Sequence, residues 1–107
     1  IAHGLGVIPV KVKITCLNGG TAKGQVQSFG TYITSGGTYA CIYNWYNNGG
    51  AGSVDVATNT SVIVYIRVTG GGTEASSTVT VDATNITLSW SGSLYTGLKI
   101  MWEAEAI

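Results

Sequence analysis

Few residues of this 107-residue chain have the type and spacing that catalysis requires. His3 is the only histidine, and it lies near an end of the chain that we expect to be flexible. A hydrolytic site needs a base within reach of a nucleophile, and His is the usual base. The five acidic residues share no motif of the paired-carboxylate kind. We therefore expect no enzyme activity, and we expect His3 to pack beside the turn that follows it or to donate a hydrogen bond there.

The sequence indicates no metal or cofactor site. Cys16 and Cys41 form no Cys-x-x-Cys motif, no Asp-rich calcium loop occurs, and the glycine clusters lack the Lys and Ser/Thr of a phosphate loop. Each cysteine lies in a strand-like run among apolar neighbours. This setting favours two buried free thiols. A disulfide between neighbouring strands is the alternative.

Aromatic and amide side chains beside a loop offer the best binding chemistry. Residues 44–48 (NWYNN) stand where a strand-like run meets a glycine-rich loop. Sugar rings can pack their C–H faces on aromatic rings while Asn side chains bond hydroxyl groups, and neither contact needs charge. The alternative is that Trp45 belongs to the core. The candidate glycan- or receptor-binding residues are Trp45, Tyr46, Asn47, Asn48 and Tyr95.

The composition excludes several classes of partner. Only 9% of the residues are charged, the formal net charge is zero, and the cations are scattered, so we expect neither nucleic-acid binding nor docking on an acidic membrane. No apolar run approaches the roughly 20 residues of a membrane-spanning helix, so we expect no membrane insertion. The chain is 45% hydrophobic, which is a folding composition rather than a disordered one.

The hydrophobic pattern has period 2 almost throughout, which is typical of half-buried strands. Thr, Val and Ile supply 35 β-branched residues, and 16 glycines supply turns. We predict about eight short strands in one all-β domain, residues 1–107, folded as an antiparallel, jelly-roll-like β-sandwich. The predicted strands are residues 10–16, 25–34, 38–46, 54–57, 62–68, 77–81, 86–91 and 98–103.

Three details of this pattern can be tested by the structure. The turn signal Ser35–Gly36–Gly37 predicts a hairpin between the second and third strands. Residues 62–68 are apolar on both faces, which predicts a central strand or one that a partner covers. Trp90 and Trp102 lie on regular apolar faces, and we place both in the core.

Both ends of the chain resemble a module found in bacteriophage tail-fibre and other virion proteins. Residues 3–9 (HGLGVIP) lead into an alternating strand, and residues 86–90 (ITLSW) and 99–104 (KIMWEA) resemble the terminal hairpin with its Trp-x-Ala ending. In such a start the glycines permit positive φ, and Leu5 can close the open end of the sandwich. The residues that match this framework are His3, Gly4, Leu5, Gly6, Pro9 and Trp102.

The resemblance implies a piece, C-terminal in position, of a longer fibre chain in a virion assembled in the bacterial cytoplasm. It implies homotrimers, contact with other virion proteins and attachment to a bacterial surface receptor, often a polysaccharide. A cytoplasmic origin also favours free thiols at Cys16 and Cys41. Two alternatives remain open: a capsid or tail decoration module, and a carbohydrate-binding module of a secreted enzyme.

Overall fold

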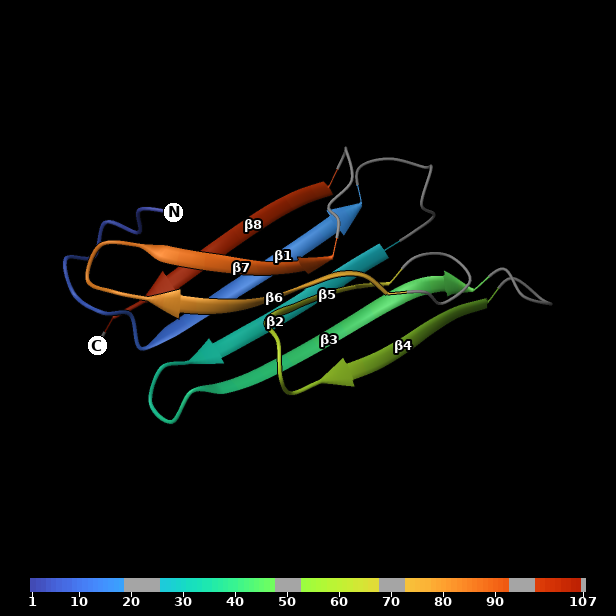
Figure 1. The fold of residues 1–107 in the computed structure, drawn as a ribbon, viewed down its shortest axis with the longest axis horizontal. Helices are drawn as coiled ribbons and strands as arrows, with labels where there is room; N and C mark the ends of the chain where they lie inside the picture. Colours follow the sequence, from blue (N-terminus) through green and yellow to red (C-terminus); the bar gives the residue numbers. More distant parts are fainter. Residues whose placement is uncertain (19–25, 48–52, 68–72, 93–97, 107) are drawn as a thin grey trace.

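The computed structural model describes residues 1–18, 26–47, 53–67, 73–92 and 98–106. Within these ranges the chain forms eight antiparallel strands and no helix, and the strands make two layers (Figure 1). The predicted antiparallel β-sandwich is therefore confirmed. The strands are β1 (Lys11–Asn18), β2 (Val26–Ile33), β3 (Thr38–Asn47), β4 (Ser53–Asn59), β5 (Val64–Arg67), β6 (Thr73–Val81), β7 (Ile86–Gly92) and β8 (Leu98–Glu105).

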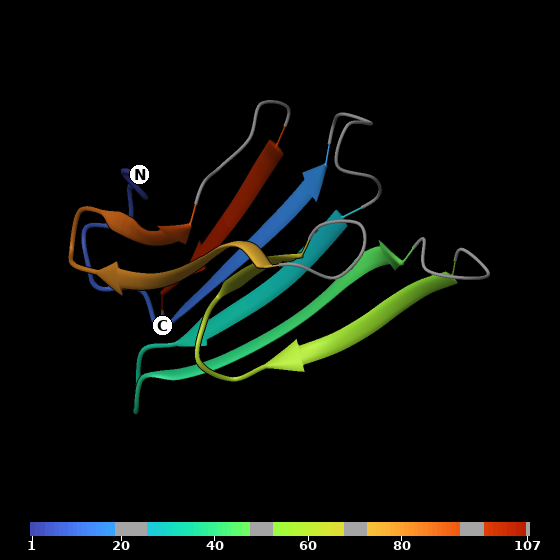
Figure 2. The same cartoon turned by 45° about the vertical axis from the view of Figure 1, so that its right-hand side comes forward.

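The larger sheet has five strands in the order β4-β3-β2-β1-β8 (Figure 2). The predicted hairpin is confirmed: β2 pairs with β3 across a turn in which Gly36 and Gly37 have φ angles of 81° and 62°. Glycine adopts these angles readily because it has no Cβ. β8 returns beside β1, with Glu105 opposite Lys11, so the first and last strands of the chain are neighbours.

The smaller sheet has three strands in the order β5-β6-β7. β5 begins later than the predicted strand 62–68 and lies at an edge, so the first alternative, a central strand, is wrong, and cover by a partner stays a prediction. Its apolar residues are covered by the larger sheet of the same chain. There the ring of Tyr65 stacks on that of Tyr43, with 4.4 Å between ring centroids.

The core lies between the two sheets and follows the period-2 pattern. Val12, Ile14 and Cys16 alternate along β1 and are fully buried, as the sequence predicts. The opposite sheet contributes the other large side chains of this cluster. The remaining members are Ile63, Val64, Ile66, Ala75, Val79 and Ile86.

Two residues join the sheets at close range. Only glycine fits at position 30 of β2, because a Cβ there would overlap the carbonyl oxygen of Ile63. The Tyr39 hydroxyl donates to the Val79 carbonyl and accepts from the Val79 N–H, both at 3.1 Å. Val79 lies past the last residue of β6 that pairs with β5, so the tyrosine satisfies backbone groups that β5 does not reach.

Candidate functional site

The structure places only part of the segment predicted to bind glycans. Trp45, Tyr46 and Asn47 are the last residues of β3, and their backbones pair with residues 53–55 of β4. The side chains of these three residues lie outside the described part of the chain, and so do Asn48 and Tyr95 altogether. Their role in binding stays a prediction.

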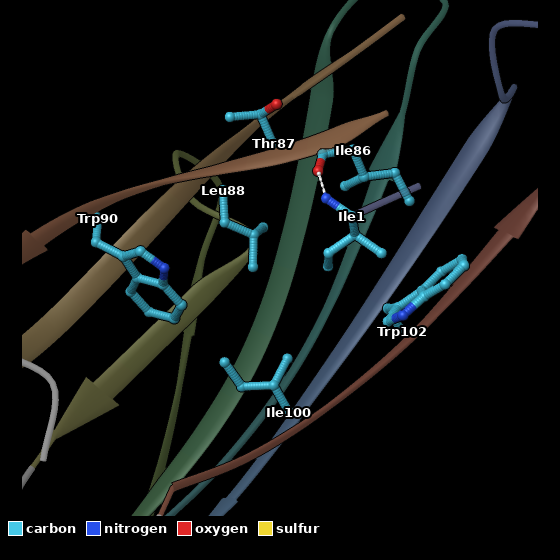
Figure 3. A pocket seen from close by; sticks show the side chains of 7 residues that line it. All are labelled: Ile1, Ile86, Thr87, Leu88, Trp90, Ile100 and Trp102. Carbon is cyan, nitrogen blue, oxygen red and sulfur yellow. Dashed lines mark hydrogen bonds between the residues drawn. The ribbon is translucent and has the colours of Figure 1, made fainter. Parts of the chain in front are cut away.

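A groove opens between the two sheets where β7 faces β8 (Figure 3). We call it the edge groove. Its volume is about 530 Å³, within the range of roughly 300–1,000 Å³ that is usual for ligand sites. In Figure 3 the side chains of Leu88 and Trp90 approach from β7, and those of Ile100 and Trp102 from β8. The lining residues are Ile1, Ile86, Thr87, Leu88, Trp90, Ile100 and Trp102.

The edge groove exists because the three-stranded sheet does not reach across β8. Ile100 and Trp102 stand opposite Cys16 and Ile14 of β1, so they share the face that forms the core. Their partners on β1 are fully buried, yet Ile100 is 38% exposed and Trp102 is 37% exposed. The prediction that Trp102 is a core residue is therefore wrong. Trp90 is half-buried and packs against the core cluster, so its prediction holds in part.

The other wall of the edge groove is completed by the start of the chain. The Ile1 nitrogen donates to the Ile86 carbonyl at 2.8 Å, and the Ile86 N–H donates back to the Ile1 carbonyl at 2.7 Å. The His3 N–H donates to the Thr84 carbonyl at 3.1 Å. Residues 1–3 thus add a short antiparallel segment beside the beginning of β7, and the expectation of a flexible end is wrong.

His3 anchors this segment through both ring nitrogens. The Leu5 N–H donates to Nδ1 at 3.2 Å, so the ring proton is on Nε2, which donates to the Asp82 carbonyl at 2.8 Å. The ring is buried beside the following turn, as predicted. Leu5 itself is exposed and does not close the sandwich, so that expectation is wrong.

Asp82 shapes the turn that receives His3. Its carboxylate accepts from the Thr84 N–H at 2.8 Å and from the Asn85 N–H at 2.6 Å. These two bonds favour the charged carboxylate and lower the pKa of Asp82 below its usual value. The Asp82 side chain therefore fixes the turn between β6 and β7. This turn contains the residues with which residues 1–3 pair.

Both cysteines are free and buried, as the sequence favours. β2 lies between their strands, and Cys16 is opposite Ser28 while Cys41 is opposite Gly30, so their Cα atoms are more than two strand spacings (about 9–10 Å) apart, which is too far for a disulfide. Burial, together with the nearby Cys41, raises the pKa of the Cys16 thiol to about 12. Burial also raises the pKa of Cys41, although hydrogen bonds from Ser28 and the Tyr65 backbone partly oppose the rise.

Apart from the Ile1 amino group, which is bonded to the Ile86 carbonyl, the described lining of the edge groove is uncharged. None of its lining residues carries a charged side chain, and its two indole rings offer flat faces and N–H donors. Among the described residues, no group of three or more His, Cys, Asp or Glu side chains is placed to hold a metal ion. The described part of the chain contains no helix long and apolar enough to span a membrane. The groove therefore suits an uncharged ligand that packs against aromatic and aliphatic surface.

Comparisons with protein-family models, curated proteins and solved structures found no match to this chain. The functional argument therefore depends on the residues and their geometry. The sequence contained one signal for the edge groove, namely two tryptophans on alternating apolar faces. It contained none for the exposure of Trp102, because that follows from the different widths of the two sheets.

Proposed function

We propose that this chain is a non-enzymatic bacteriophage virion domain, a distal tail-fibre module that attaches the particle to a bacterial surface polysaccharide. The observation that carries the binding part of the proposal is the edge groove with its two partly exposed indoles. Sugar rings present C–H faces that pack on such rings without any need for charge. Several copies in a homotrimeric fibre would bind at the same time, so that contacts that are weak singly give strong attachment together.

The start of the chain supports the virion part of the proposal. The glycines of residues 3–9 permit positive φ, and Gly4 and Gly6 have φ angles of 74° and 73°. His3 and Pro9 are both buried. Four of the six framework residues, His3, Gly4, Gly6 and Pro9, thus have a structural role in the segment that leads into β1, whereas Leu5 and Trp102 are exposed.

Binding to intact cells tests this function. The labelled chain would be mixed with a panel of bacterial strains before and after their surface polysaccharide is removed. We expect binding to at least one strain, loss of binding after removal, and affinity about tenfold lower for Trp102→Ala. Val7→Ala, which changes an exposed residue outside the groove, is the control. Binding that survives removal of the polysaccharide would contradict the proposed receptor class.

The segment predicted from the sequence needs its own test on the same strains. Tyr46→Ala and Tyr95→Ala remove the aromatic side chains next to the two loops. If the segment contacts the receptor, each change lowers binding by a similar factor. If both variants bind as wild type while Trp102→Ala does not, the receptor site is the edge groove alone.

A structural role as a capsid or tail decoration module is the second candidate. The observation that favours it is the outer face of the five-stranded sheet, where several large apolar side chains are exposed. Such a face suits packing against other virion proteins. Immunolabelling of intact particles distinguishes the two locations, because a fibre module is labelled at the distal tip and a decoration module over the shell or the tail.

A further inference from the structure

The two outer faces of the sandwich differ sharply in chemistry. The three-stranded sheet presents hydroxyl side chains to solvent. These exposed residues are Thr78 and Thr80 of β6 with Thr87, Ser89 and Ser91 of β7. The five-stranded sheet instead presents a row of outward-facing residues, which the strand register places side by side across all five strands. In order, the row is Met101, Thr15, Phe29, Ile42 and Thr58.

The large members of this row are far from buried. Ile42 is 53% exposed, Met101 54% and Phe29 45%, and Val56 in the next row is 64% exposed. An antiparallel sheet with one face on the core normally carries polar side chains on its other face. Exposed apolar surface of this kind, here on adjoining strands at Phe29, Ile42 and Val56, marks an interaction site. We call this surface, made of the row and Val56, the apolar face.

Charge on this side of the sheet is confined to two of the five strands. The described outward side chains of β2, β3 and β4 are all uncharged. The charged ones stand on β1 and β8, where Lys11 lies 3.9 Å from Glu105, Lys13 is opposite Glu103, and Lys99 is opposite the uncharged Leu17. The described charges of this side sum to one positive charge, so the face attracts neither a strongly acidic nor a strongly basic partner and repels a second face of its own kind only weakly.

The whole outer side of the five-stranded sheet, with the apolar face across its middle, is large enough for an interface between folded chains. Five strands about 4.8 Å apart and seven to ten residues long form a surface of roughly 600 Å² in projection. Projecting side chains make the accessible area larger, and a stable interface uses about 800 Å² per partner. Most soluble oligomers are built from copies of one chain.

We propose that the apolar face is the surface through which copies of this chain pack against one another. The proposal deepens the assembly part of the proposed function and rests on it for its biological setting. Phe29 and Ile42 form the centre of the contact, and Met101 lies toward its rim, beside the charged residues of β1 and β8. The hydroxyl face and the edge groove stay accessible in the assembly.

Sedimentation velocity measures this association directly on the 107-residue chain. We expect wild type to sediment as a defined oligomer that dissociates on dilution. Ile42→Lys buries a charge in the contact and should weaken association at least tenfold. Val7→Lys is the matched control, because Val7 is also 53% exposed but lies outside the five-stranded sheet. Circular dichroism verifies that each variant is folded.

A second pair of variants keeps the proposal testable if Ile42→Lys does not fold. Thr58→Lys places a charge at the edge of the apolar face, and Thr80→Lys places the same charge on the hydroxyl face. We expect only Thr58→Lys to weaken association. A wild-type monomer at about 0.5 mM, or equal behaviour of the two variants in a pair, overturns the proposal. The measurement needs no receptor, so its failure leaves attachment through the edge groove standing.

Discussion

At the scale of single residues, Gly30 determines how closely the sheets approach. It lies on the core side of β2, opposite Ile14 and Cys41, and the backbone of Ile63 occupies the space where its side chain would be. A backbone oxygen cannot rotate away as a flexible side chain can. The contact between β2 and the segment that enters β5 therefore requires glycine.

Gly30→Ala tests this requirement. We expect the free energy of unfolding to fall by about 3 kcal/mol, the upper end for overpacking, because the sheets must separate to admit the methyl group. Thr31→Ala, the next residue and on the opposite side of the strand, should cost about 0.5 kcal/mol or less. Urea unfolding of both variants measures the difference. Equal losses of unfolding free energy in the two variants would mean that the strands shift freely around residue 30.

Cys16 should make the stability depend on alkaline pH. Its folded-state pKa of about 12 lies above the ordinary value of 9.0, so the folded chain keeps a proton that the unfolded chain loses. Stability is fully present below pH 9 and falls by about 1.4 kcal/mol for each pH unit between 9 and 12. Urea unfolding at several pH values should give a shallower decline for Cys16→Ala. Parallel declines for wild type and variant would refute this assignment.

At the scale of strands and sheets, the period-2 pattern predicted most of the fold. The eight strands, the hairpin of β2 and β3 and the buried side of β1 follow from local alternation, which each strand carries in its own residues. The pattern could not assign strands to sheets. A segment that is apolar on both faces, as residues 62–68 are, can form a central strand or an edge strand covered by another sheet. β5 is an edge strand of this kind.

The same limit explains what was predictable of the candidate site. Alternation correctly placed Trp102 on the core side of β8, but burial requires an opposite sheet that extends that far. A sheet of three strands cannot cover five, and the number of strands in each sheet is a long-range property. The apolar face was missed for a related reason. Ile42 stands between buried Cys41 and Tyr43, and one apolar residue on the outward side of a strand indicates no surface until the register places Phe29 beside it.

Tyr39 offers a test of how the two sheets are joined. Tyr39→Phe keeps the ring but leaves the Val79 N–H and carbonyl without the hydroxyl, which should lower the free energy of unfolding by about 2 kcal/mol. Tyr32→Phe is the control, since no hydrogen bond of its hydroxyl is found in the described part of the chain. Hydrogen exchange should also show faster exchange at the Val79 amide in Tyr39→Phe alone. Unchanged exchange there would show that water replaces the hydroxyl without cost.

At the scale of the whole molecule, low charge is compatible with both proposed activities. The described lining of the edge groove has no charged side chain, and the few outward charges of the five-stranded sheet stand on β1 and β8 and sum to one positive charge. Binding and assembly use different surfaces, so many copies can present their grooves at once. Recognition through ring faces and hydroxyl groups should then be insensitive to salt, unlike recognition through charged groups, which screening weakens.

The most direct test measures the affinity for purified surface polysaccharide from a strain to which the chain binds. Titration calorimetry would compare wild type with Trp102→Ala at about 50 mM and about 500 mM salt, a range over which charge-based contacts are largely screened. We predict wild-type affinity that changes less than about twofold with salt, and affinity about tenfold lower for folded Trp102→Ala at both concentrations. Affinity that collapses at high salt, or a Trp102→Ala variant that binds as wild type, would contradict recognition through the edge groove.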